Sequence, residues 1–160
     1  MRLATWNMKQ AVAPVLGQAA AWAWMEEHVA PDVAVLTEAK VPKEGLPAGW
    51  TAEWVEGGIG PRRRWGTVVT GRGVRLERVS EVRSRLRTRP LIPTWPAAMI
   101  VADAFVGSER WATIVGLYAV TFDGEGRRTG NGSYSLPKLL EDLEPLLASR
   151  RGDRLVLAGD

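Results

Sequence analysis

Residues 33–38 read Val-Ala-Val-Leu-Thr-Glu, and the predicted fold class follows from them. Its continuous apolar run is typical of a strand that is buried on both faces, as in parallel sheets. A similar run, Met1–Trp6, ends at Asn7. Apolar residues at helical spacing between the two runs predict a helix over about 15–28. Strand, helix and strand form a βαβ unit, so we expect Asn7 and Glu38 at the same edge of one sheet.

Beyond Lys40 the sequence changes to short strands separated by Gly, Pro and Arg. Gly71-Arg72-Gly73 and Gly107-Ser108-Glu109 each predict a hairpin turn between two of these strands. An amphipathic helix is expected over about 135–149, with Pro137 in its first turn. The strands that we expect in this part of the chain are residues 51–55, 66–70, 74–80, 98–106, 110–118 and 155–158.

The last of these strands is unusual because it ends the sequence at Gly159-Asp160. A continuous apolar strand of this kind needs a neighbour on each side. We therefore expect residues 1–160 to be one incomplete domain, truncated at the Gly-Asp motif.

Composition excludes several classes of protein and site. The chain has 160 residues, 46% of them apolar and 24% charged, which is typical of a globular protein with a single core. The absence of Cys excludes a disulfide scaffold and a Cys-ligated zinc site, and the single His, His28, leaves little room for a Ser-His-Asp triad. No apolar run reaches the length of a membrane span and no signal peptide is visible, so we expect a cytoplasmic protein with no membrane partner.

Three polar residues directly follow three of the expected strands: Asn7, Glu38 and Asp160. An amide and two carboxylates at one edge of a sheet supply the oxygen ligands that Mg²⁺ or Mn²⁺ prefers. The alternative is that each residue merely caps the turn that follows it. Their equivalent positions at the ends of strands favour a site.

The chain also resembles the endonuclease/exonuclease/phosphatase superfamily, which includes deoxyribonucleases and apurinic/apyrimidinic endonucleases. The resemblance runs from residue 2 to residue 160 and rests on the order of five short motifs. It implies an α/β fold, namely the N-terminal half of a four-layer α/β sandwich with mixed β-sheets. The motifs are Arg-Leu-Ala-Thr-Trp-Asn-Met at 2–8, Leu-Thr-Glu-Ala-Lys at 36–40, Gly-Thr-Val-Val-Thr-Gly at 66–71, Gly-Leu-Tyr-Ala at 116–119 and Leu-Ala-Gly-Asp at 157–160.

The same resemblance implies a role for four residues. Glu38 resembles the carboxylate that binds the catalytic Mg²⁺ (or Mn²⁺), and Asn7 resembles the residue that helps to hold that ion. Tyr118 resembles the residue that faces the scissile phosphate, and Asp160 resembles the Asp that orients or deprotonates the attacking water. The implied activity is metal-dependent hydrolysis of a phosphodiester or phosphomonoester, as in an endonuclease, exonuclease or phosphatase.

Some of the superfamily's functional residues have no match. Its signature Asn, a second Asp and the catalytic His would follow Asp160, and His28 does not match any of them. We therefore expect little or no turnover from residues 1–160 alone.

A basic segment suggests a polyanionic partner. Residues 62–89 contain ten Arg against two Glu, and Arg62-Arg63-Arg64-Trp65 combines phosphate-binding charge with an aromatic ring that could stack on a base. The alternative is a solvated surface, since like charges are often grouped for solubility. Two further hypotheses remain open beside the enzyme: a non-catalytic nucleic-acid or polyanion-binding half-domain, and a truncated gene product.

Overall fold

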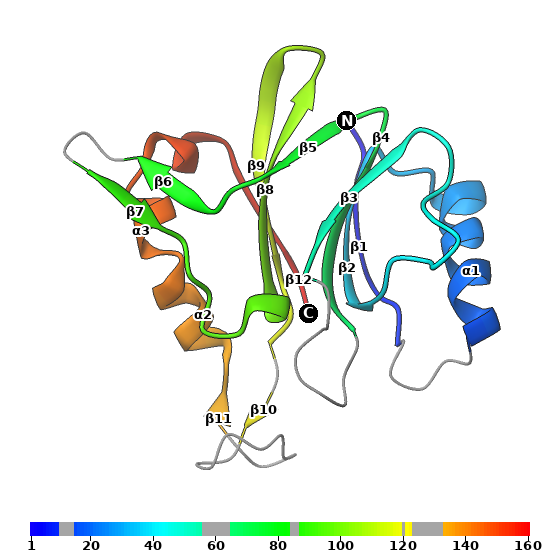
Figure 1. The fold of residues 1–160 in the computed structure, drawn as a ribbon, viewed down its shortest axis with the longest axis horizontal. Coiled ribbons are helices and arrows are strands. Elements are labelled where there is room, and N and C mark those ends of the chain that lie inside the picture. Colours follow the sequence, from blue (N-terminus) through cyan, green and yellow to red (C-terminus); the bar gives the residue numbers. More distant parts are fainter. Residues whose placement is uncertain (10–14, 56–64, 84–86, 120, 123–132) are drawn as a thin grey trace.

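The computed structural model describes residues 1–9, 15–55, 65–83, 87–119, 121–122 and 133–160. Two four-stranded sheets pack face to face, and helices cover their outer faces (Figure 1). Both sheets contain parallel and antiparallel pairs. The predicted α/β class and mixed sheets are therefore confirmed, and the layers follow the order helix, sheet, sheet, helix.

The first sheet has the strand order β1-β2-β4-β3. Strands β1 and β2 are parallel, as the βαβ unit predicts, and β4 runs antiparallel to both β2 and β3. Helix α1 and the π-helical turn η1 connect β1 to β2 and bury Trp22 and Met25 against the sheet. The bounds are β1 (Leu3–Asn7), α1 (Val15–Trp24), η1 (Met25–Val29), β2 (Val33–Ala39), β3 (Trp50–Trp54) and β4 (Gly66–Arg72).

The second sheet has the strand order β12-β9-β8-β5. Strands β8 and β9 form the predicted hairpin, and β12 adds parallel to β9. Its outer face packs on the helices through Leu139, Leu143 and Leu146. The bounds are β5 (Arg75–Arg78), η2 (Pro96–Ala98), β8 (Met99–Val106), β9 (Glu109–Leu117), α2 (Leu136–Asp142), α3 (Glu144–Leu147), η3 (Arg150–Arg154) and β12 (Leu155–Gly159).

The core between the sheets is built from small and β-branched side chains, including Val35, Val69, Ala102 and Ile114. At its centre lies Gly116 of β9, where an added Cβ would approach the Thr67 methyl group to 2.7 Å. No larger residue fits there, because the two sheets already touch.

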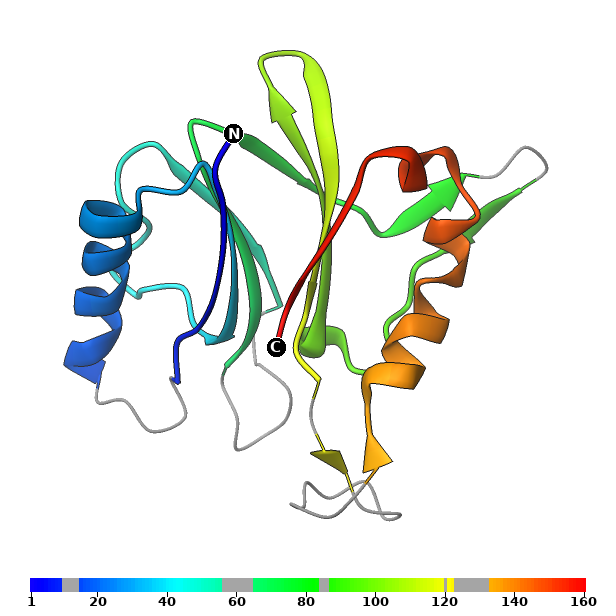
Figure 2. The same cartoon turned by 180° about the vertical axis from the view of Figure 1, so that it is seen from behind.

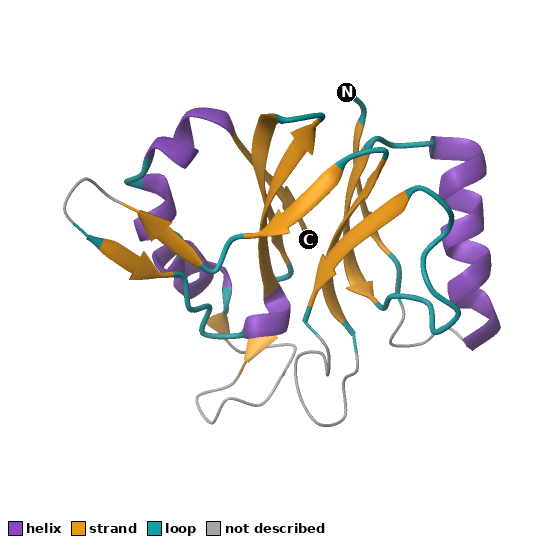
Figure 3. Cartoon of the chain, turned by 45° about the horizontal axis from the view of Figure 1, so that its top comes forward, coloured by secondary structure: helices purple, strands orange, loops and turns teal. Residues whose placement is uncertain are grey.

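Two short hairpins extend from this sandwich (Figure 3). Strands β6 (Glu81–Arg83) and β7 (Thr88–Pro90) pair with each other, as do β10 (Thr121–Phe122) and β11 (Ser133–Tyr134). No helix in the described part of the chain is long and apolar enough to cross a membrane.

Some sequence-based expectations for these elements were wrong. The chain at Gly71–Gly73 does not close a hairpin, because β4 belongs to the first sheet and β5 to the second. The helix expected over 135–149 divides into α2 and α3, since Pro145 lacks the N–H that a continuous helix needs. The last strand, β12, lies at a sheet edge and has one neighbour, β9, among the described strands. The expectation that residues 1–160 are an incomplete domain is not contradicted by this and stays a prediction.

The buried carboxylate of Asp103 links η3 to the second sheet through an ion pair with Arg151. Asp103 of β8 is 5% exposed, and its carboxylate accepts a hydrogen bond from the Thr113 hydroxyl at 2.6 Å. Its other oxygen, Oδ2, lies 3.1 Å from the Arg151 guanidinium, and Arg110 Nη1 lies 3.6 Å from Oδ1. A buried carboxylate needs such partners, because removal from water is otherwise costly.

We expect Asp103→Ala to lower the free energy of unfolding by about 3 kcal/mol, because it leaves Arg110 and Arg151 without their shared partner. Urea unfolding measures this change. Glu141→Ala is the matched control: it breaks the exposed Lys138–Glu141 pair, and its effect on the free energy of unfolding should be much smaller, because water screens an exposed ion pair. Equal losses in the two variants would contradict a structural role for the buried charge.

Candidate functional site

The carboxyl ends of four strands meet at one rim of the sandwich. Asn7 pairs with Thr37 at the end of the parallel β1–β2 pair, and Gly159 pairs with Leu117 at the end of the parallel β12–β9 pair. Figure 2 shows the C-terminus between the two sheets at this end of the molecule. Residues that directly follow these strands are therefore brought together, as in other sheets whose parallel strands end at a common edge.

The alternation of side chains directs several of these residues into the space between the sheets. Trp6 packs on the α1 side of the first sheet, so Asn7 faces the second sheet. Ala158 of β12 and Ile114 of β9 pack between the sheets, which places Asp160 and Tyr118 on the same inner side.

Two hydrogen bonds join the sheets at this rim. The Asn7 Nδ2 donates to Asp160 Oδ2 at 2.5 Å, and the Tyr118 hydroxyl donates to Glu38 Oε1 at 2.8 Å. Tyr118 is buried, Asn7 and Glu38 are half-buried, and Asp160 is exposed. We call Asn7, Glu38, Tyr118 and Asp160 the rim cluster.

Glu38 reaches this cluster only through a backbone irregularity. Ala34 and Leu36 face α1, so simple alternation would turn Glu38 toward that side as well. Instead the register between β2 and β4 shifts between Leu36 and Ala39, and Glu38 has a φ of 48°. This bulge turns the carboxylate toward Tyr118, at the energetic cost that a left-handed conformation imposes on a residue with a side chain.

The Asn7 carboxamide is oriented from both ends. Its Oδ1 accepts the Lys9 backbone N–H at 2.9 Å, while its Nδ2 donates to Asp160. Two backbone hydrogen bonds fix Asp160. Its N–H donates to the Leu117 carbonyl at 3.0 Å, and its carbonyl accepts from the Ala119 N–H at 2.7 Å. Gly159 makes this possible, because a Cβ at that position would lie 1.8 Å from the Leu117 carbonyl oxygen.

The donor set of the rim cluster fits a hard divalent cation. It offers two carboxylates and one amide oxygen, and only one oxygen of Glu38 is engaged by Tyr118. Among the described residues, no three His, Cys, Asp or Glu side chains gather into a cluster. Proteins commonly hold Mg²⁺ through one or two carboxylates while it keeps several waters, and the two carboxylates of the rim cluster match that donor set.

Other residues singled out by the sequence lie elsewhere or outside the described residues. Arg62, Arg63 and Arg64 fall outside them. Trp65, which follows, is at the same rim as Glu38, because its neighbour Gly66 pairs with Ala39.

His28 is remote from the rim and stacks on Trp24, with ring centroids 5.0 Å apart. Two surface hollows, of about 610 and 510 Å³, lie around Met1, Asp32 and Arg72 at the opposite ends of β1 and β2. Neither hollow includes a member of the rim cluster.

Sequence reasoning missed Thr37. It is 0% exposed, and its hydroxyl has no hydrogen-bond partner among the described residues. The sequence did contain a feature that could have pointed to Thr37, because it is a polar residue inside an apolar strand, directly before Glu38.

Comparisons with known proteins bear on the fold. No family model matches the sequence, and no curated protein matches it. The structure is similar to the crystal structure of the AP endonuclease LMAP from Leishmania major, with a TM-score of 0.56 and 19% sequence identity. The match covers 98% of this chain and 53% of that protein, so the chain spans about half of its length. The likeness shows that the two share an endonuclease/exonuclease/phosphatase-like fold.

The bulge at Glu38 leads to a prediction about stability. Glu38→Gly and Glu38→Ala both remove the carboxylate, but only glycine adopts a positive φ without steric cost. We expect the glycine variant to be more stable than the alanine variant by about 1 kcal/mol in urea unfolding. The control is Thr5 on β1, where glycine should be the less stable of the two by about 0.5–1 kcal/mol. If the alanine variant is the more stable of the two at both positions, the assignment of backbone strain to Glu38 is wrong.

Proposed function

We propose that this chain contributes the active site of a divalent-metal-dependent phosphoesterase, which hydrolyses a phosphodiester or phosphomonoester bond. The observation that carries the proposal is the rim cluster, in which Asn7 meets Asp160 and Glu38 meets Tyr118 across the two sheets. The shared fold with an AP endonuclease supports the same class of reaction.

In this proposal each residue of the cluster has a separate task. Glu38 is the metal-binding carboxylate, and the Tyr118 hydroxyl fixes one of its oxygens. Asp160 accepts the proton of the attacking water, and Asn7 holds that carboxylate in place while its own oxygen helps to bind the ion. A bound Mg²⁺ or Mn²⁺ would polarise the phosphoryl group and stabilise the leaving oxygen. Tyr118 would face the substrate phosphate.

We propose nucleic acid as the substrate class. The solved protein of similar fold is an AP endonuclease. Trp65 lies at the rim, and in the sequence it directly follows three Arg residues, 62–64, which are outside the described residues. A sequence that combines Arg with Trp suits contact with a phosphate backbone and its bases.

The test is a cation titration followed by a cleavage assay. We expect Glu38→Gln to weaken Mg²⁺ and Mn²⁺ binding by at least about tenfold in calorimetry, because it removes a charged oxygen donor, whereas Asp160→Asn should act on cleavage alone. In both variants, the rate of cleavage of a duplex oligonucleotide with one abasic site should fall by about 100-fold or more relative to the wild type. Glu53→Gln, which removes a carboxylate of β3 outside the cluster, should leave both readouts unchanged. Wild-type cation affinity in Glu38→Gln would show that the assignment is wrong.

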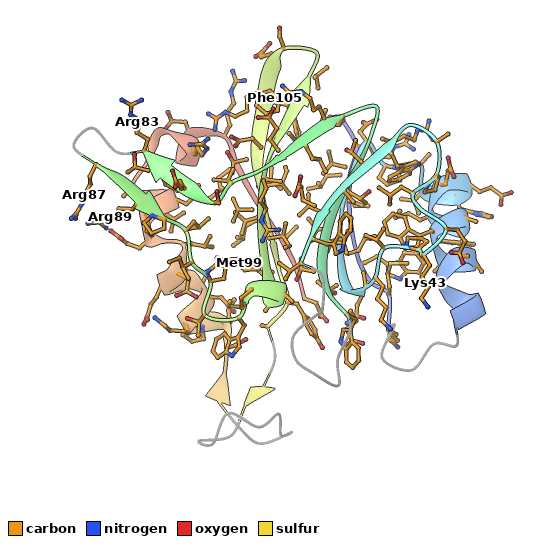
Figure 4. All side chains as sticks on the ribbon, viewed as in Figure 1. Lys43, Arg83, Arg87, Arg89, Met99 and Phe105 are labelled. Atoms are coloured by element: carbon orange, nitrogen blue, oxygen red, sulfur yellow. The ribbon has the colours of Figure 1, made fainter. Side chains whose placement is uncertain are left out.

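A second candidate function is non-catalytic binding of a polyanion. Arg83, Arg87 and Arg89 lie together on the β6–β7 hairpin, far from the C-terminus (Figures 1 and 4). Of these, Arg89 already pairs with Glu144 at 3.2 Å. Binding to DNA that weakens steeply with salt and does not change with EDTA, without cleavage, would favour this function over the phosphoesterase.

A further inference from the structure

Thr37 contributes a buried polar group that none of the roles above uses. Its side chain is 0% exposed, and its hydroxyl lies without a hydrogen-bond partner among the described residues. The other buried threonines of the first sheet differ from it, since Thr67 donates to the Ala98 carbonyl and Thr70 to the Thr51 carbonyl. An unpartnered buried hydroxyl destabilises a fold, so its presence beside Glu38 calls for a functional reason.

The register of the first sheet shows where this hydroxyl lies. Thr37 follows Val33 and Val35 on the face of β2 that packs between the sheets. Its partner across the parallel pair is Asn7, and paired residues of neighbouring strands project on the same face about 5 Å apart. The backbone is fixed here, because the Thr37 carbonyl accepts the Met8 N–H at 2.9 Å. Thr37 is therefore the nearest neighbour of Asn7 on the inner face of β2.

Asn7 has a donor left for this neighbour. A carboxamide nitrogen carries two N–H groups, and the hydrogen bond to Asp160 uses one of them. A threonine hydroxyl has the lone pairs to accept the other.

We propose that Thr37 is a positioning residue for the rim cluster: its hydroxyl accepts the second Nδ2 N–H of Asn7 when the site binds a divalent cation. This bond holds the carboxamide in its cation-binding orientation. The inference rests on the proposed function, because it gives the hydroxyl a partner only in the cation-bound protein. Thr37 acts through Asn7 and touches neither the cation nor the substrate.

The first arm of the test measures stability without metal. Thr37→Val keeps the shape of the side chain and removes a hydroxyl that has no partner in the described part of the chain, so its melting temperature in EDTA should equal or exceed that of the wild type. Thr70→Val is the matched control, because it removes a hydroxyl with a partner, and its melting temperature should fall. A clear loss of stability in Thr37→Val would assign the hydroxyl a structural role and overturn the proposal.

The second arm measures Mn²⁺ and Mg²⁺ affinity by calorimetry. Thr37→Val should bind about tenfold more weakly than the wild type, whereas Thr37→Ser and Thr70→Val should bind like the wild type. In an Asn7→Ala background, Thr37→Val should cause no further loss, because its effect passes through Asn7. Unchanged affinity in Thr37→Val overturns this inference and leaves the proposed function standing. Absence of cation binding by the wild-type chain overturns both.

Discussion

The contact between the two sheets at Gly116 sets the geometry of the rest of the structure. With no side chain at this position, β9 approaches β2 and β4 so closely that an added Cβ would lie 3.1 Å from Val35 and 3.2 Å from Val69. This fixes the spacing of the sheets two residues before Tyr118. The Tyr118 hydroxyl then reaches Glu38 on the opposite sheet at hydrogen-bond distance. A wider sandwich would leave the strand ends in the same order but would separate the two halves of the rim cluster.

Two consecutive residues of β2 carry local energetic costs, and both belong to the rim. Thr37 buries a hydroxyl that has no partner within the described ranges, and Glu38 adopts a left-handed backbone. Strand β2 can hold them because it lies between β1 and β4 and is buried on both faces. Costs of this kind persist where the surrounding structure over-determines the conformation, and they concentrate at functional sites.

Much of the architecture could be predicted because it depends on patterns local to the sequence. The apolar run at 33–37 and the helix before it predicted the parallel β1–β2 pair, and the position of Asn7 and Glu38 after their strands predicted that they meet at one edge. The bulge at Glu38 could not be predicted, because alternation alone turns this residue to the other face. Nor could the placement of β4 and β5 in different sheets be predicted. Gly71-Arg72-Gly73 has the residues of a tight turn, but β4 is buried on both faces and lies between β2 and β3. Thr37 was overlooked because its significance lies in a missing hydrogen bond, which only the three-dimensional arrangement reveals.

The bond between Asn7 and Asp160 closes a loop of 153 residues, and the bond between Tyr118 and Glu38 spans 80. Contacts of such high sequence separation form slowly, because the entropy of closing the intervening chain must be overcome before they add any stability. The rim cluster is therefore assembled only when both sheets have folded and docked. On the ribosome, Asn7 is synthesised 153 residues before Asp160, so the two side chains cannot meet until β12 has emerged. Formation of the two hydrogen bonds of the rim cluster would thus report the docking of the two sheets rather than the formation of any one element.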